Sequence, residues 1–256
     1  MIPSPTKAAI EITNLRIEYR GRGWRGLPAV AVSELTLEVA TGEVFGFLGP
    51  NGAGKTSTLQ VLLGFQPPTS GRALVHGAQP SDPAARRRIG YLPEQTSYYP
   101  FLTGEELLRF YGTLFGLAGS RLDQRVAALL RLVGLQEAKD RRLQTYSKGM
   151  QQRAGLAQAL INDPDVVILD EPASGLDPVG RVKVREVIQN LKAEGKTVFF
   201  SSHELGEVET VCDRVAILDH GELRVVGRVA ELIEAHGPSL EQVFLNFVRT
   251  EPASAL

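Results

Sequence analysis

Short runs of apolar and β-branched residues, separated by glycine and proline, fill the first third of the chain. They cover residues 10–19, 31–39, 44–48 and 72–76. Alternation with a period of two places every second side chain on one face, which is the pattern of a half-buried strand. The first part of the chain is therefore predicted to be rich in strands, with a helix after Lys55.

The apolar period becomes helical in the middle of the chain. Between residues 103 and 161, apolar residues recur three or four positions apart, as in Leu107, Leu108, Tyr111 and Leu114. Residues with this spacing share one face of a helix. This segment is interpreted as a separate helical lobe.

Strands and helices alternate in the last third. Apolar runs at 166–169 and 197–201 flank a helical stretch at 179–191, and this strand-helix-strand pattern predicts parallel, buried strands. The remaining predictions are a hairpin of strands 214–218 and 222–226 around the turn Asp219-His220-Gly221, and amphipathic helices at 229–235 and 239–248.

Composition limits the functions to consider. The chain has 256 residues, 43% of them apolar, which suits one compact domain. Its 28 basic and 29 acidic residues give a net charge of -1, so electrostatics predict no nucleic-acid partner. Cys212 is the single cysteine and cannot form an internal disulfide. No secretory signal and no run of about 18 apolar residues is visible, so the protein is predicted to be cytoplasmic.

A phosphate-binding motif follows the third predicted strand. Glycine backbone in such a loop turns successive N–H groups toward phosphate oxygens, and the next helix presents its positive end. Lys55 is predicted to reach the β- and γ-phosphates, and the Thr56 hydroxyl to bind Mg²⁺. The motif GxxxxGK[ST] comprises Gly49, Pro50, Asn51, Gly52, Ala53, Gly54, Lys55 and Thr56.

Two acids end the apolar run 166–169. Buried carboxylates are costly unless a cation or a reaction uses them. Asp170 is predicted to hold the magnesium ion through water. Glu171 is the candidate general base, or water-orienting group, for attack on the γ-phosphate.

A second candidate anion site precedes the helical stretch 154–161. Ser147 and Gly149 at a helix start can supply a hydroxyl and backbone donors, although an ordinary serine N-cap is the alternative. In the sequence YSKGMQQR, from Tyr146 on, these two residues match the signature of ABC ATPases, which the chain resembles. Lys148 and Met150 stand where the commonest form has Gly and Gln.

Further motifs follow in the family's order. Residues 174–177 (SGLD) resemble the D-loop, which couples two sites, and residues 201–203 (SSH) resemble the switch histidine segment. The resemblance covers 10–248. It implies that His203 contacts the γ-phosphate and helps to place Glu171 and the water.

The resemblance implies an α/β fold, a P-loop NTPase of ABC type with a mixed central sheet, an N-terminal antiparallel β part and an inserted helical lobe. The chain would be one domain. Its nucleotide-binding core would cover about 7–94 and 162–250, its signature lobe about 95–161, and 251–256 would be a frayed tail.

The resemblance also implies a head-to-tail dimer with ATP and Mg²⁺ as cofactors. Each ATP would lie between Lys55 of one copy and Ser147 and Gly149 of the other. The nucleotide contacts carried over are Tyr19, Gly49, Pro50, Asn51, Gly52, Ala53, Gly54, Lys55, Thr56, Ser57, Ser147, Lys148, Gly149, Met150 and Asp177.

Two assignments stay open. After Ile89-Gly90-Tyr91-Leu92-Pro93 the family usually has a glutamine, whereas here Glu94 and then Gln95 follow, and either could offer an oxygen to magnesium. Tyr19 is the candidate for stacking on adenine, with Trp24 as its competitor.

Three segments resemble sequences in subunits of bacterial export systems of the multidrug, gliding-motility and sodium-export type. They are YLPE at 91–94, YSKGM at 146–150 and SLEQVF at 239–244. The expected function is Mg-dependent ATP hydrolysis that drives export through separate membrane permease subunits. The protein would act as a homodimer on the inner face of the cell membrane. The alternatives are a soluble ABC ATPase of translation or DNA repair, and a module that holds ATP without turnover.

Overall fold

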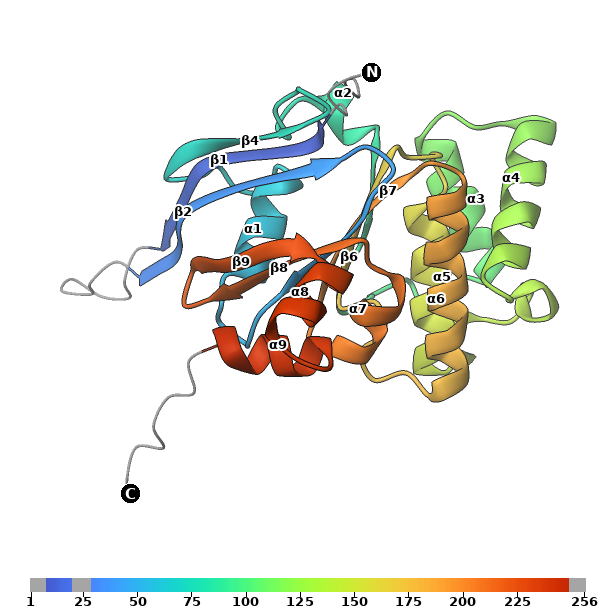
Figure 1. Ribbon diagram of the computed structural model, residues 1–256. Coiled ribbons are helices and arrows are strands. Elements are labelled where there is room, and N and C mark those ends of the chain that lie inside the picture. Colours follow the sequence, from blue (N-terminus) through green and yellow to red (C-terminus); the bar gives the residue numbers. More distant parts are fainter. Residues whose placement is uncertain (1–7, 20–28, 249–256) are drawn as a thin grey trace, which may run out of the picture. The chain divides into compact units, whose positions relative to one another are not determined.

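The computed structural model describes residues 8–19 and 29–248 (Figure 1). They form two compact units. The first contains the described residues up to Arg86 and those from Ser201 onward, and the second runs from Arg87 to Phe200. The tail 251–256 lies outside the described residues.

The first unit contains an antiparallel sheet of three strands. β1 (Ala8–Tyr19) lies between β2 (Ala29–Ala40) and β4 (Ser70–Val75) and is antiparallel to both (Figure 1). The alternating pattern buries one face, with Ile10 and Leu15 fully covered. The predicted N-terminal antiparallel β part is thus confirmed.

A second strand set in this unit carries the phosphate loop. β3 (Val44–Leu48) is parallel to β8 (Arg214–Asp219), which is antiparallel to β9 (Glu222–Arg228). All five side chains of β3 are buried, as expected for a strand covered on both faces.

The β8–β9 connection is the predicted hairpin. Asp219 pairs with Glu222, so the turn consists of two residues. His220 has φ 50° and Gly221 has φ 78°. Two positive φ angles in a two-residue loop define a type I′ turn, the geometry that matches the twist of paired strands.

The helices of the first unit are short. α9 begins after Ser239, whose Oγ accepts a hydrogen bond from the N–H of Gln242 at 3.4 Å, so the predicted helix start at 239 is the cap. Two helices were not predicted, because four and seven residues are too few for a periodic pattern. The helices are α1 (Lys55–Leu62), α2 (Pro83–Arg86, unpredicted), α7 (Leu205–Val211, unpredicted), α8 (Val229–His236) and α9 (Leu240–Phe247).

In the second unit, β6 (Val166–Asp170) lies between β5 (Ile89–Leu92) and β7 (Thr197–Ser202), and β5 and β6 are parallel. The sequence did not predict β5, which has only four residues. Gly90 interrupts its apolar run, because a Cβ there would collide with the carbonyl oxygen of Ala159. Parallel and antiparallel pairs together confirm the mixed α/β fold class.

The predicted helical segment 103–161 forms three α-helices that pack on one another. α3 starts with a complete capping box between Thr103 and Glu106. The α-helices of this unit are α3 (Gly104–Leu114), α4 (Gly119–Leu132), α5 (Lys148–Ala159) and α6 (Pro178–Ala193), with 3₁₀ turns at Gln136–Ala138 and Leu143–Thr145.

Candidate functional site

The loop between β3 and α1 can be built only with glycine at two positions. Gly54 precedes α1 with φ 100° and offers no side-chain cap. A Cβ on Gly54 would collide with the carbonyl oxygen of Ala31, and one on Gly49 would lie 2.5 Å from the carbonyl oxygen of Leu218. The loop therefore approaches its neighbours by backbone alone, and its N-cap residue, Gly54, offers no side-chain acceptor to the start of α1.

Backbone hydrogen bonds fix this loop to the β8–β9 hairpin. The N–H of Gly221 donates to the carbonyl of Ala53 at 3.2 Å, and the N–H of Ser33 donates to the carbonyl of Gly221 at 2.7 Å. Within the loop, the N–H of Ala53 donates to the carbonyl of Pro50 at 3.2 Å. The cradle is therefore held in shape by the protein itself.

Lys55 places a cation inside the cradle. Its side chain is buried, and Nζ donates to the carbonyl oxygens of Gly49 at 2.5 Å and Pro50 at 3.2 Å. A buried ammonium is costly unless it is paired with an anion or well hydrogen-bonded. A buried cation at the N-terminal end of a helix suits a phosphate group. The next residue, Thr56, is exposed, so its hydroxyl is accessible for a magnesium ion bound with that phosphate.

Tyr19 lies beside this cradle. Its hydroxyl donates to Ser57 Oγ at 3.0 Å and accepts from Gln66 Nε2 at 3.0 Å. The residue is 40% exposed. Its role in adenine binding stays a prediction, and the competitor Trp24 lies outside the described residues.

The predicted acids end β6 in the second unit. Every residue of β6 is buried, with Asp170 5% and Glu171 8% exposed. Glu171 has φ 49°, a left-handed conformation that costs a non-glycine residue about 1–2 kcal/mol. Strained residues of this kind gather at functional sites. No pattern in the sequence indicates this backbone conformation.

Tyr91 on β5 responds to the charge at this strand end. Burial raises its pKa to about 12, and the negative charge of Asp170 adds to the rise. Tyr91 therefore keeps its proton near neutral pH and is a neutral hydroxyl. Glu94 and Gln95 follow β5 and are both exposed, so which of them binds magnesium remains a prediction.

The signature segment forms the start of α5. Ser147 is the N-cap, and its Oγ accepts from the N–H of Met150 at 3.3 Å. A Cβ on Gly149 would lie 3.7 Å from Leu176 Cδ2, so the signature contacts the 174–177 turn. Asp177 Oδ1 accepts from the N–H of Gly180 at 2.9 Å and thereby caps α6.

Arg153 anchors the signature helix. Its Nη1 donates to the carbonyls of Val133 at 2.8 Å and Gly134 at 3.0 Å, where α4 ends. In the sequence, Arg153 stands out only as the last residue of the signature segment. The signal that could have found its role is a cation four residues after Gly149, where it can satisfy helix-end carbonyls.

His203 belongs to the first unit and is exposed. The turn that carries it is closed by Ser202, whose Oγ accepts from the N–H of Glu204 at 2.9 Å. The structure thus brings together Tyr19 and the phosphate loop in the first unit. In the second unit it brings the signature and the 174–177 turn together.

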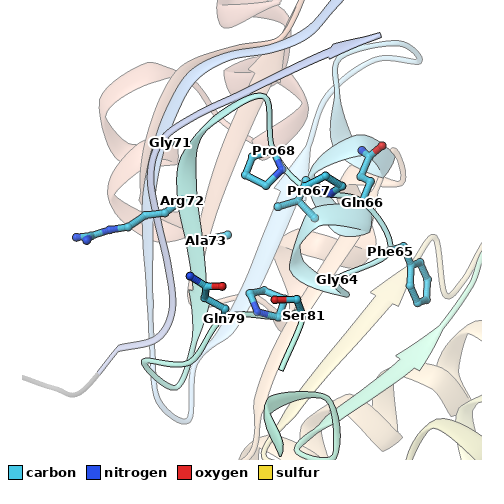
Figure 2. Close-up of a pocket in the computed structure, with 12 residues that line it drawn as sticks. Gly64, Phe65, Gln66, Pro67, Pro68, Gly71, Arg72, Ala73, Gln79 and Ser81 are labelled. Carbon is cyan, nitrogen blue, oxygen red and sulfur yellow. The ribbon is translucent and has the colours of Figure 1, made fainter. Parts of the chain in front are cut away.

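A separate pocket of the first unit lies between the end of α1 and β4 (Figure 2). It contains none of the predicted site residues. It is lined by Val61, Gly64, Phe65, Gln66, Pro67, Pro68, Gly71, Arg72, Ala73, Gln79, Pro80 and Ser81.

A strand, a glycine loop and a helix start with a buried lysine define a P-loop nucleotide-binding protein. The family model described as ABC transporter matches residues 32–174. The chain therefore belongs to the ABC transporter family, in the class of its ATP-binding subunits, and the predicted resemblance is confirmed.

Known relatives agree. An uncharacterised ABC transporter ATP-binding protein of Synechocystis sp. is 49% identical over 84% of this chain, and the match spans 61% of that protein. The Nod factor export ATP-binding protein I of Cupriavidus metallidurans is 40% identical over 80% of this chain and 69% of its own length. The linearmycin resistance ATP-binding protein of Bacillus subtilis is 37% identical over 80% and 67%.

A solved structure of the ATP-binding subunit of an ABC transporter is 29% identical and superimposes with a TM-score of 0.81, covering 93% of this chain and 99% of that one. The ABC-type P-loop fold is thus confirmed. Among the described residues, no helix is both long and apolar enough to span a bilayer.

Proposed function

We propose that this protein hydrolyses ATP to drive export through an ABC transporter. The observation that carries the proposal is the phosphate cradle, in which Lys55 is buried beside the uncapped start of α1. Triphosphate oxygens supply the anion that both features require.

Each of the predicted site residues has its own role in ATP hydrolysis. Lys55 binds the β- and γ-phosphates, Glu171 accepts a proton from the attacking water, and His203 contacts the γ-phosphate. Thr56 and Asp170 have the oxygen donors that a hard cation prefers and would hold Mg²⁺. When bound, that ion neutralises charge on the phosphates.

The partners are a second ABC subunit, most simply another copy of this chain, and membrane-spanning permease subunits. Two relatives carry export or resistance in their names, which supports export. The protein would then work on the inner face of the cell membrane. Within this proposal, 95–161 is the signature lobe and the segments on either side form the nucleotide-binding core.

The test compares ATP hydrolysis by the purified full chain and by Glu171→Gln, over a range of protein concentrations and with and without magnesium. We expect magnesium-dependent turnover that rises more steeply than linearly with concentration and disappears in the variant. Glu234→Gln, an exposed glutamate on α8, serves as the matched control and should behave like the wild type. Turnover that is linear in concentration and survives Glu171→Gln would overturn both the base and the dimer.

A further inference from the structure

Lys148, the first residue of α5, lies over the turn that follows Glu171. A Cβ on Gly175 would overlap the Nζ of Lys148 and would lie 3.2 Å from its Cε. A side chain at 175 and Lys148 in its present position therefore exclude each other. Gly175 also has φ 67°, a conformation that favours glycine.

Charge pairing within the described protein does not explain this placement. Lys148 forms no ion pair with any acid in the described ranges, and α5 has no acidic residue in its first turn. A cation at a helix N-terminus is disfavoured by the helix dipole. The ammonium nonetheless lies next to Gly175, where the signature meets the 174–177 turn.

That turn is continuous with Glu171. The N–H of Ser174 donates to the carbonyl of Glu171 at 3.1 Å, and the N–H of Leu176 donates to the carbonyl of Ala173 at 3.2 Å. Downstream, the turn is fixed where Asp177 caps α6. Its tip, Gly175, is exposed and lies next to the Lys148 ammonium.

We propose that Lys148 is a positioning residue for the hydrolysis step, which it serves by linking the start of α5 to Glu171 through Gly175. The inference rests on the proposed function. Its ammonium responds to the negative charge of nucleotide phosphates at the start of α5, and its contact with Gly175 transmits the response to the Glu171–Leu176 turn. Glu171 is sensitive to that turn because its own backbone is left-handed.

The first experiment measures kcat and KM for ATP in Lys148→Gly, Gly175→Ala and the double variant. We expect kcat to fall about tenfold in each single variant, in line with the cost of a misplaced catalytic group, with KM nearly unchanged. The double variant should be no slower than the slower single variant, because both changes break the same link. Lys148→Arg, which keeps the charge, should retain most activity, and Lys183→Gln is the control for loss of one lysine from this unit.

The second experiment does not depend on turnover. Amide hydrogen exchange of Ser174 and Leu176 should be faster in Lys148→Gly than in the wild type, while exchange in the core of β6 stays the same. Unchanged exchange at these two amides, or multiplicative loss of kcat in the double variant, would overturn the proposal. If the wild type shows no Glu171-dependent hydrolysis, the proposed function fails, and the exchange result still decides whether Lys148 holds the turn.

Discussion

Three helix starts in this protein differ in how their first N–H groups are satisfied. α3 satisfies its own end, with Thr103 accepting from Glu106 N at 3.2 Å and Glu106 accepting from Thr103 N at 2.8 Å. α5 satisfies one N–H through Ser147. α1 follows the N-cap Gly54, which provides no side-chain cap. The three ends form a series from closed to open.

An open end alone does not identify a ligand site, because α4 also starts without a side-chain cap. What distinguishes α1 is the buried ammonium of Lys55 inside a loop that glycine alone can form. The difference between α1 and α4 shows that a helix start without a side-chain cap indicates a phosphate site only when a buried cation lies beside it.

The largest expected effect comes from removing that charge. Lys55→Met should weaken ATP binding by at least about 100-fold, the cost of losing a charge-assisted contact in a buried site. Fluorescent nucleotide titration measures it, with circular dichroism as the check on folding. Lys183→Met, on α6, should bind like the wild type. Unchanged affinity for ATP in Lys55→Met would mean that the start of α1 is not the phosphate site.

The next effect tests the glycine cradle. Gly54→Ala should lower the free energy of unfolding by about 2–3 kcal/mol, because it adds both backbone strain and a clash with Ala31. Gly52→Ala is the matched control, since its φ is 83° but no atom lies within contact of a Cβ. It should cost only about 1 kcal/mol of strain. Urea denaturation of both variants gives the difference, and equal losses would show that the clash is relieved at no cost.

A smaller effect is expected at the half-satisfied end. Ser147→Ala should destabilise the protein by about 1 kcal/mol through loss of the N-cap, and Ser147→Asn should restore most of it. Chemical denaturation checks both. A Ser147→Ala variant as stable as the wild type would mean that the cap bond to Met150 adds nothing, and α5 would join α1 among the open ends.

The smallest effect concerns the closed end. The Lys139 ammonium and then the Arg109 guanidinium donate hydrogen bonds to Glu105 and hold the pKa of that carboxyl below its ordinary value of 4.5. Because the pKa is lowered by folding, this stabilisation is fully present above pH 4.5 and is lost as the pH falls through the folded-state value.

Glu105→Gln should therefore lower Tm by about 2 °C at pH 7, a modest amount because the pairs are partly exposed. The difference from the wild type should shrink below pH 4.5. Thermal melts from pH 7 to pH 3 measure it. A difference that is constant with pH would mean that the carboxylate charge plays no part.

Much of the fold was predictable because its patterns are long or repeated. β6 opens with four consecutive apolar residues, β3 has two apolar residues on each side of Gly46 directly before the phosphate motif, and the β8–β9 hairpin has a turn glycine between two strands. β5 was missed because Gly90 serves close packing against α5 rather than a turn. A strand of four residues is too short to show a period of two, and its glycine is required by packing against a backbone carbonyl that is distant in the sequence.

Only part of the candidate site could likewise be predicted from the sequence. The phosphate loop was predictable because each residue has a local task within one strand, loop and helix. The proximity of Lys148 to Gly175 was not predictable, because it joins two segments that lie apart in the sequence, and no local pattern indicates the left-handed backbone of Glu171. Composition and spacing carry no record of such contacts.

Because the backbone of Glu171 is left-handed, selection for stability and selection for activity favour different residues at this position. Replacing Glu171 by glycine would relieve strain of about 1–2 kcal/mol and yield a more durable protein without its proposed base. A library screened only for survival at high temperature should therefore enrich glycine at this position, whereas a screen for ATP hydrolysis should keep glutamate. Conformational stability and catalytic activity would therefore favour different residues at position 171.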